Sequence, residues 1–482
     1  MILKSLSKKN IGILTLLVVL LITILLVGLY FSGIFNGNTL QEEPLQNDIK
    51  VSYNYASSGL ILDLFIINKD KNLYAMGFSN FGRVSSEVSE KPYLILDNVI
   101  SVSNYWALKE DGTLWNISPQ HIPYKIADNV KYFESAFLFS VVYLKNDHTF
   151  WKSGWVKGLS DRPEKLLTNV KSFHTDLVIK TDNSLWKVDS FSSKAVKITD
   201  NVSDIKHIKV EEDFTSKMFI IKDDNSLWEL DYSSFEQLSN KRVDSYLKML
   251  LSDVVELYFR NSSYYALKLD HGLWAWGNND NGQIGNGTQN KVEVPIKVLD
   301  GVKTVKTTGE AVYVHKDDNS VWTWGKDLEG NIKPSPNFLI GDVKERFSVG
   351  YPKEENDAYT PENMVFLKNN NQLFCINNYS ANKQPTLMLE NVKSCKYTER
   401  SINAITQDGN LWSWGDEFNP YGWLTNEPMK VADGATAIVD CQYITFFTKS
   451  DGSLWAVGHL YKWINGKIQV EKADPTPWKV FP

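Results

Sequence analysis

The residues that could do chemistry in this sequence are mostly aspartates, which recur four residues before an aromatic residue. Nine copies of this spacing carry Asp, and a tenth has Asn370 in its place. Paired carboxylates could serve a hydrolase or lyase as general acid and base in the central channel of a ring-shaped fold. However, an Asp in Asp-Gly or Asp-Asn also hydrogen-bonds the backbone of its own turn. Because the acid recurs in every copy and no pair stands out, the turn interpretation is favoured and the hydrolase or lyase is a minor alternative.

Histidine and glycine motifs give no other reactive site. The seven histidines contain no HExxH pair, and His148 and His271 stand at a turn position otherwise held by Gly or Asn. No GxSxG elbow, P-loop or dinucleotide fingerprint occurs. The sequence therefore predicts a protein that is not an enzyme, with no catalytic residue, no metal site, no cofactor and no bound nucleotide.

The three cysteines are too few for a disulfide framework. Cys375, Cys395 and Cys441 all lie late in the chain, and Cys395 and Cys441 occupy comparable places in successive repeats. A bridge between those two is an alternative, but free thiols packed as small apolar side chains are the favoured interpretation.

Ten copies of one hairpin pattern organise the chain from about residue 49 onward. Each copy reads apolar-apolar-Lys-x-Asp-(Gly/Asn/His)-(Ser/Thr)-Leu-Trp, and the spacing between copies, roughly 35 to 52 residues, is typical of solenoids and propellers. Asp-Gly and Asp-Asn tolerate the positive φ of a tight hairpin turn. The aromatic anchors are Tyr74, Trp115, Trp151, Trp186, Trp228, Trp274, Trp322, Phe374, Trp412 and Trp455. One large aromatic residue in each copy is expected to pack at the seam between stacked units.

The two ends of the repeat array are complementary. The array begins with NDIKVSY, an inner-type strand, and ends with TPWKVFP, a proline-bearing strand of the kind that precedes such a strand elsewhere. We therefore expect an all-β propeller of short antiparallel blades, with seven to ten blades, closed into a ring by joining its two ends. Two smaller rings, or hairpins absorbed as insertions, are the alternatives.

One unit, LWAWGNNDNGQIGNGTQNKVEVPIKVLDGV at 273–302, carries a longer signature. Its marked positions are Trp276, Gly277, Asn278, Gly282, Gln283, Gly285, Gly287, Pro295 and Val298. The unit resembles a repeat of the regulator-of-chromosome-condensation family, whose founding members form seven-bladed propellers, and is similar to the short blades of bacterial propeller-type β-lactamase inhibitor proteins. The resemblance implies a rigid disc that mostly binds proteins. Nucleotide exchange and chromatin docking are not carried over, because function belongs to sites and not to folds.

The N-terminal segment has the character of a membrane anchor. No charged residue lies between Asn10 and Gln41, and this stretch holds an aliphatic run of the ~20 residues needed to cross a bilayer. Lys4, Lys8 and Lys9 precede the run, which favours a cytoplasmic N-terminus. A cleaved signal peptide is the alternative. We expect a short cytoplasmic tail at 1–10, a transmembrane signal-anchor helix at 11–32, a stalk at 33–48 and the propeller at 49–482, outside the cell.

The charge balance restricts the partners. The net charge is −6, although the first 41 residues contribute only lysines, so the rest of the chain is more acidic still. Such a domain, without a basic stripe in its sequence, argues against nucleic acid. The abundance of Asn, Lys and Ile is typical of a low-GC bacterium. We therefore predict a bacterial, membrane-anchored binding protein at the cell surface whose ligand is another protein, with a cell-envelope glycan as the alternative.

Binding residues are sought where the repeat fails or carries extra aromatic rings. Trp276, Trp324 and Trp414 follow their anchors by two residues, so each shares a strand face with its anchor. They are expected either to pack between blades or to line one mouth of the ring as a binding surface. Tyr351 and Tyr359 lie in a polar insertion at 348–363, and a second insertion at 235–254 is expected to include one short helix.

Overall fold

All the named elements in the described part of the computed structural model are strands. The described residues are 43–44, 49–55, 61–77, 89–118, 122–136, 140–154, 162–174, 176–189, 193–204, 208–210, 217–231, 246–307, 310–327, 330–344, 348–349, 364–376, 384–397, 401–415, 427–441, 444–464 and 467–481. The predicted tail, membrane helix and most of the stalk lie outside these residues. Within them, no helix is long and apolar enough to cross a membrane.

The strands form ten antiparallel sheets, each made from consecutive segments of the chain. The first three blades are β1 (Glu43–Pro44), β2 (Lys50–Tyr55), β3 (Ile61–Ile67), β4 (Leu73–Gly77) and β5 (Ser89–Leu96); β6 (Val99–Ser103), β7 (Trp106–Lys109), β8 (Leu114–Asn116) and β9 (Tyr124–Ala127); and β10 (Val130–Ala136), β11 (Ser140–Lys145), β12 (Phe150–Gly154) and β13 (Glu164–Leu167). Blades four to six are β14 (Val170–His174), β15 (Leu177–Lys180), β16 (Leu185–Val188) and β17 (Ala195–Thr199); β18 (Ile208–Val210), β19 (Lys217–Ile221), β20 (Leu227–Asp231) and β21 (Lys248–Leu251); and β22 (Val254–Arg260), β23 (Ser263–Lys268), β24 (Leu273–Gly277) and β25 (Val292–Leu299). Blades seven to ten are β26 (Val302–Thr307), β27 (Ala311–Lys316), β28 (Val321–Lys326) and β29 (Ile332–Ile340); β30 (Ser348–Val349), β31 (Met364–Leu367), β32 (Leu373–Ile376) and β33 (Thr386–Leu389); β34 (Val392–Tyr397), β35 (Ser401–Thr406), β36 (Leu411–Gly415) and β37 (Met429–Ala432); and β38 (Ala435–Cys441), β39 (Ile444–Lys449), β40 (Leu454–Ile464) and β41 (Lys467–Lys479).

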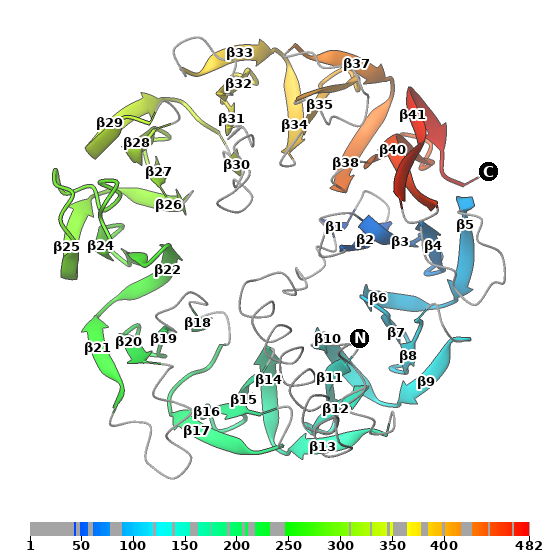
Figure 1. The fold of residues 1–482 in the computed structure, drawn as a ribbon, viewed down its shortest axis with the longest axis horizontal. Coiled ribbons are helices and arrows are strands. Elements are labelled where there is room, and N and C mark those ends of the chain that lie inside the picture. The colour runs from blue at the N-terminus through cyan, green and yellow to red at the C-terminus, as the bar shows by residue number, and fades with distance from the viewer. Residues whose placement is uncertain are drawn as a thin grey trace, which may run out of the picture.

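The ten sheets stand around one axis as the blades of a propeller (Figure 1). The earliest strands of each blade lie nearest the centre and the last lies at the rim. The prediction of an all-β propeller of short antiparallel blades is confirmed, and the predicted range of seven to ten resolves to ten blades in a single ring.

The core is divided into ten separate clusters, each lying between two neighbouring blades. Between blades six and seven, for example, Tyr265 and Leu273 pack with Val305 and Trp324. Burying one such side chain completely stabilises the fold by ~1.5–3 kcal/mol. Adhesion between blades therefore depends on apolar packing repeated around the ring, as the periodic sequence requires.

Apolar packing also closes the ring. Val51 and Ile66 of blade one share a buried cluster with Phe446 and Leu454 of blade ten, and the rings of Tyr74 and Phe481 lie 4.9 Å apart. The closed ring was expected, but the expectation that the two chain ends complete one unit is wrong. β2 pairs within blade one and β41 within blade ten, because each hairpin finds its fourth strand immediately downstream.

The outer strands explain where the prolines lie. Pro92, Pro295 and Pro334 sit on the outermost strands β5, β25 and β29. Proline has no amide hydrogen to donate to a neighbouring strand, so an edge strand is where it is tolerated. Of the segment 235–254, in which one short helix was expected, the structure describes residues from 246 onward: Tyr246 has 3₁₀-helical geometry, and residues 248–251 form the outer strand β21, with Leu251 opposite Leu227. The rest of the segment lies outside the described residues, so the helix stays a prediction there.

Candidate functional site

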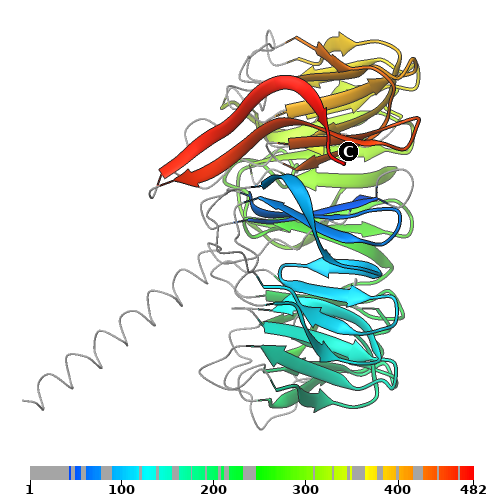
Figure 2. The ribbon, with the colours of Figure 1, turned by 90° about the vertical axis from the view of Figure 1, so that its right-hand side faces the viewer.

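The meander of every blade gives the disc two unlike faces. Connections between the second and third strands of a four-stranded blade, and from one blade to the next, lie on one face, which we call the turn face. Connections between the first and second strands, and between the third and fourth, lie on the other, which we call the loop face. The β40–β41 hairpin extends beyond the ring on the loop face (Figure 2).

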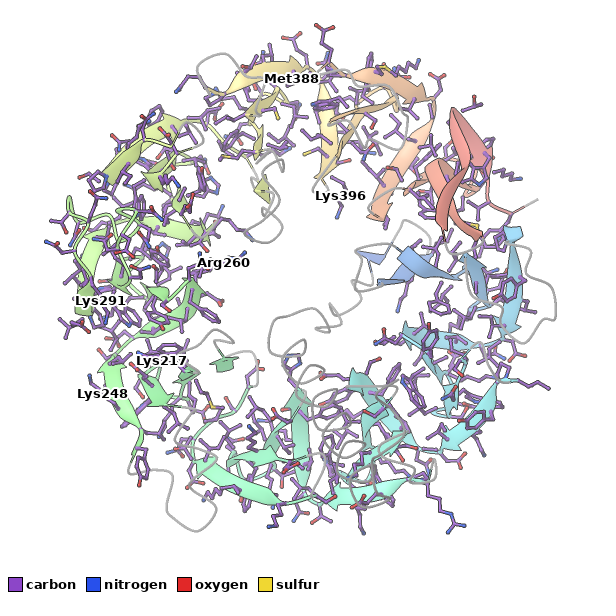
Figure 3. All side chains as sticks on the ribbon, viewed as in Figure 1. Lys217, Lys248, Arg260, Lys291, Met388 and Lys396 are labelled. Atoms are coloured by element: carbon purple, nitrogen blue, oxygen red, sulfur yellow. The ribbon has the colours of Figure 1, made fainter. Side chains whose placement is uncertain are left out.

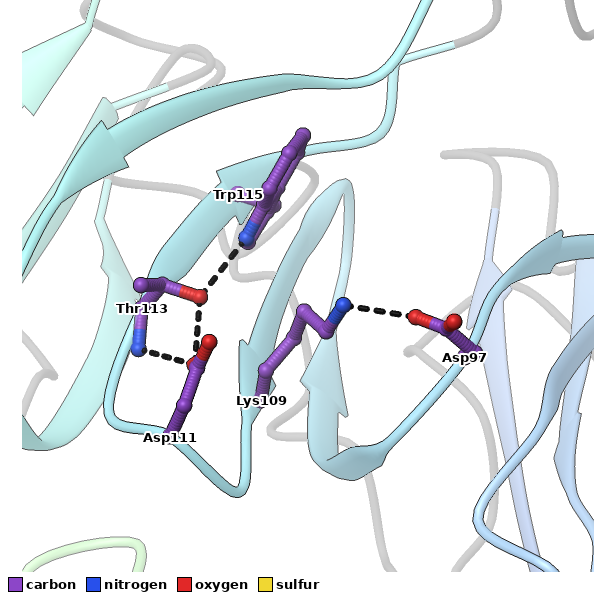
Figure 4. Close-up of polar contacts among 5 residues, drawn as sticks. All are labelled: Asp97, Lys109, Asp111, Thr113 and Trp115. Atoms are coloured by element: carbon purple, nitrogen blue, oxygen red, sulfur yellow. Dashed lines mark hydrogen bonds and ion pairs between the residues drawn. The ribbon is translucent and has the colours of Figure 1, made fainter.

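The aspartates of the repeat hold the hairpins of the turn face. In blade two, the backbone N–H and the Oγ1 hydroxyl of Thr113 donate to Asp111 Oδ1 at 2.9 and 2.6 Å. Trp115 Nε1 in turn donates to Thr113 Oγ1 at 2.8 Å (Figure 4). The same Asp–Ser/Thr–Trp relay recurs at Asp147–Thr149–Trp151, Asp182–Ser184–Trp186, Asp224–Ser226–Trp228, Asp318–Ser320–Trp322 and Asp451–Ser453–Trp455. These contacts support the turn interpretation of the acids.

The charged groups around the relay also bind to other residues of the protein. The hydroxyl bond from Thr113 lowers the pKa of Asp111 below its usual value, so this acid is ionised and unsuited to hold a proton at neutral pH. Lys109 Nζ donates to Asp97 Oδ1 at 2.6 Å and lies 5.7 Å from the centroid of the Trp115 ring. The anchor aromatics are half-buried against the seams, so the recurrent Lys, Asp and Trp residues form a structural unit.

In the hairpin turns of the turn face, the residue directly after the repeat Asp links one blade to the next. His148 and His271 have φ values of 63° and 61° there, as predicted for turn residues. The backbone oxygen of His148 accepts from Val170 N at 2.9 Å, and that of His271 accepts from Val302 N at 2.9 Å. Each acceptor lies in one blade and each donor begins the inner strand of the next. The left-handed turn therefore directs a carbonyl across the seam, which fixes the neighbouring blade.

The described strand ends that flank both predicted insertions lie at the loop face. The segment at 348–363 joins β30 to β31 and the segment at 235–254 contains the connection from β20 to β21, and both are connections of loop-face type. Tyr351 and Tyr359, proposed from the sequence as binding residues, lie outside the described residues. The described strand ends nevertheless bring the two insertions to the same side of the disc.

The three extra tryptophans lie in the seams between blades. Trp276, Trp324 and Trp414 are 3, 1 and 1 % exposed, so none presents a ring face to a ligand. Of the two positions weighed from the sequence, the structure shows packing between blades. Trp324 Nε1 donates to the backbone oxygen of Gln283 at 2.8 Å. Trp276 Nε1 and Trp414 Nε1 have no acceptor among the described residues. The loops of the blades that precede them, at 232–245 and 377–383, lie outside the described residues.

The long loop after β24 has a rigid internal structure. Asn279 is fully buried; its Nδ2 donates to the backbone oxygens of Thr288 and Asn290 at 2.9 and 3.0 Å, and its Oδ1 accepts from Ile284 N at 2.9 Å. Gln283 is 1 % exposed, and its backbone oxygen accepts from Tyr265 Oη at 2.9 Å as well as from Trp324. The signature residues of this unit therefore join blades six and seven.

The remaining histidines and the cysteines form no reactive cluster in the described part of the chain. No group of three or more His, Cys, Asp or Glu able to hold a metal occurs there. His315 is 3 % exposed, and burial lowers its pKa. Neither Cys375 nor Cys395 forms a disulfide, and burial raises the pKa of Cys375 to about 12. The side chain of Cys441 lies outside the described residues, so its pairing stays a prediction.

The inner strands carry cationic residues that the sequence analysis did not single out. In seven blades the register between the first and second strands shifts just after the first inner-strand residue. Such a bulge leaves one residue without a partner across the ladder. In four blades this residue is an exposed lysine: Lys131, Lys171, Lys303 and Lys393. A signal was present in the sequence, because each of these lysines follows the landmark Val of Asn-Val or Gly-Val.

Comparison with known proteins identifies one repeat. Residues 270–312 match the family model described as the regulator of chromosome condensation (RCC1) repeat. This match confirms the resemblance predicted from residues 273–302. The kinship with bacterial propeller-type inhibitors stays a prediction, and no curated protein sequence matches the chain.

Similar solved structures include proteins from human and yeast. Human WBSCR16 shares 16 % identity over 67 % of this chain and 88 % of its own, with a TM-score of 0.35. Prp20p from Saccharomyces cerevisiae, in a structure reported together with its binding to Gsp1p and histones, shares 19 % identity over 50 % of this chain and 69 % of its own, with a TM-score of 0.33. Yeast RCC1 (Prp20) bound to Kap60 shares 13 % identity over 82 % of this chain and 85 % of its own, again with a TM-score of 0.33.

Proposed function

We propose that this propeller, which carries an RCC1 repeat, is held at the outer side of a bacterial cell membrane by its N-terminal segment and binds a protein partner through its loop face. The observation that carries the proposal is the unequal use of the two faces. The turn face is built from short, repeated hairpins whose Asp, Ser/Thr and Trp side chains bond one another. The loop face carries the connections that differ from blade to blade, and varied loops on a rigid scaffold are where proteins place recognition.

The membrane part of the proposal is supported by the sequence. Residues 11–32 are long and apolar enough to span a bilayer, and the lysines lie on their N-terminal side. Protease treatment of intact cells tests the orientation: the propeller should be digested without lysis, and the full-length chain should sediment with membranes after a carbonate wash. Protection of the propeller until lysis would contradict an external position, and release by carbonate would contradict an anchor.

The binding part predicts which face the partner contacts. Lysine-directed cross-linking of the full-length chain in its native membranes, followed by mass spectrometry, should join a partner to Lys194 and Lys291 at the loop face. Lys69 and Lys71 in the first turn-face hairpin are the matched controls and should give few cross-links to the same partner. A partner cross-linked mainly through Lys69 and Lys71 would overturn the assignment of the binding face.

The insertion at 348–363 offers a second, independent test. Replacing residues 352–361 with a Gly-Ser linker of equal length should remove the partner recovered by cross-linking, because the insertion contributes to the loop face. The control is the change Lys69→Gln, which alters an exposed residue of the first turn-face hairpin, on the face that the partner should not contact. Undiminished recovery with the linker variant would exclude the insertion from the binding site.

A further inference from the structure

The innermost strands of the ring have open edges. In nine of the ten sheets the first strand, from β6 to β38, pairs on one side only among the described residues. An open edge presents backbone N–H and C=O groups that can accept a further strand. These nine edges all lie nearest the axis (Figure 1).

The inner strands carry mostly positive charge, although the chain as a whole has a net charge of −6. Their basic residues are Lys50, Lys131, Lys171, Lys209, Arg260, Lys303, Lys306, Lys393 and Lys396, against the acidic residues Glu134, Glu256 and Asp440. Glu134 is engaged by His174, whose Nδ1 lies 3.1 Å from its Oε1. The described inner strands are thus more basic than the chain as a whole.

The basic residues are densest from blade six to blade nine. We call Arg260, Lys303, Lys306, Lys393 and Lys396 the basic arc; its four lysines are exposed and its arginine is half-buried. Figure 3 shows Arg260 and Lys396 on the inner side of the ring. Lys303 and Lys393 are the bulged residues of β26 and β34, so each lacks a cross-strand neighbour. The bulges therefore leave cationic side chains beside open strand edges.

Blade one shows that an inner edge accepts an acidic extended segment. There the chain adds its own short strand β1 to β2, with Glu43 opposite Val51 and Pro44 opposite Lys50. The sequence around β1, QEEPLQND at 41–48, carries three carboxylates and no basic residue. Two residues of this acidic stretch, Glu43 and Pro44, thus form an added strand beside Lys50, the first basic residue of an inner strand.

We propose that the basic arc binds an extended acidic polypeptide segment, which adds as an antiparallel strand to the inner edge of β26 or β34. Backbone hydrogen bonds supply the pairing, as between β1 and β2, and carboxylates along the segment pair with lysines of the arc. The proposal rests on the proposed function, because the segment belongs to the protein partner. The partner would thus bind at two places, at the loop face and at the centre of the ring.

Fluorescence anisotropy on the full-length chain in detergent micelles tests the site. The probe is a fluorescein-labelled peptide of six Glu-Val repeats, which alternates charge along an extended chain, and the neutral control peptide has six Gln-Val repeats. The variant Lys306→Gln/Lys396→Gln removes two charges of the arc. The matched control Lys165→Gln/Lys430→Gln removes two exposed charges from the outermost strands β13 and β37, which lie at the rim of the ring (Figure 1).

The acidic peptide should bind saturably, at least tenfold more tightly than the neutral one, and should weaken as salt rises. The arc variant should lose at least tenfold in affinity and the rim variant less than twofold, with unchanged circular dichroism in both. Equal losses in the two variants, equal binding of the neutral peptide, or no saturable binding would overturn the proposal.

Hydrogen exchange distinguishes strand addition from simple charge attraction. The acidic peptide should slow exchange of backbone amides in β26 or β34, whereas heparin, a polyanion unable to add as a strand, should not. Binding without this protection would overturn strand addition. If the peptide fails to bind while partner cross-links to Lys194 and Lys291 persist, this inference fails and the proposed function stands.

Discussion

Substituting Gly285 should weaken the seam between blades six and seven by an amount that can be worked out from its surroundings. A Cβ built at this glycine would lie 2.7 Å from Trp324 Nε1, 2.9 Å from Trp324 Cε2 and 3.0 Å from Val298 Cγ1. The indole must move, and its bond to the Gln283 oxygen is then lost. We expect Gly285→Ala to cost about 1–2 kcal/mol for its left-handed backbone, about 1 kcal/mol or more for overpacking, and about 1 kcal/mol for the unpaired indole N–H.

Gly330→Ala is the matched control for the backbone term alone. Gly330 has a φ of 85°, close to the 82° of Gly285, but an added Cβ would meet no atom within 4 Å. Urea unfolding followed by tryptophan fluorescence should therefore give a loss of about 1–2 kcal/mol for Gly330→Ala and about 3–4 kcal/mol for Gly285→Ala. Equal losses in the two variants would refute the argument that the loop after β24 fixes Trp324.

Four further outcomes are expected. Ser184→Ala should lower the free energy of unfolding by about 1–2 kcal/mol in urea, because Trp186 Nε1 loses its acceptor, and Ser184→Thr should restore it. Hydrogen bonds from Ser184 hold the pKa of Asp182 below its usual 3.8, so ionised Asp182 stabilises the fold above pH 3.8. This contribution should be lost as the pH falls through the lower pKa of the folded state, and an acid titration followed by circular dichroism would show the loss. Cys375, with its pKa raised to about 12, should resist iodoacetamide at pH 8 until urea is added, which mass spectrometry would show. The hydrogen bond to Glu134 raises the pKa of His174, so the pair stabilises the fold fully below pH 6.5, and this contribution is lost as the pH rises through the raised pKa. In an NMR titration, the pKa of His174 should be lower in Glu134→Gln than in the unchanged protein.

The repeat architecture could be predicted from the sequence because each hairpin is determined locally. Asp, a left-handed third residue, Ser or Thr, and an aromatic anchor all serve one turn, so their spacing repeats with the blades. His148 fits this rule, since its φ of 63° is that of the Asn or Gly found at the same position elsewhere. The ten repeats match the ten blades because every hairpin forms a sheet of its own, although the sequence left any number from seven to ten open.

Long-range features were harder to predict for physical reasons. The sequence predicts that Trp276 lies on the same strand face as its anchor. It does not tell whether that part of the face contacts a neighbouring blade or solvent. The segment 235–254 was expected to include one short helix, but its composition did not show that its end, residues 248–251, pairs with β20 as a strand. The inner-strand lysines escaped notice because a bulge interrupts the alternation from which a strand's two faces are inferred.

The closure of the ring has a consequence for how such a protein can change in size. Among the described residues, each strand pairs within its own blade, and blades one and ten share a buried apolar cluster that includes Val51 and Phe446. Duplication or loss of one whole unit would leave no strand without its sheet, and the new first and last blades would still meet through the same kinds of apolar surface. A change of this kind would alter the ring diameter by one whole blade, and with it the spacing between the inner edges that face the axis.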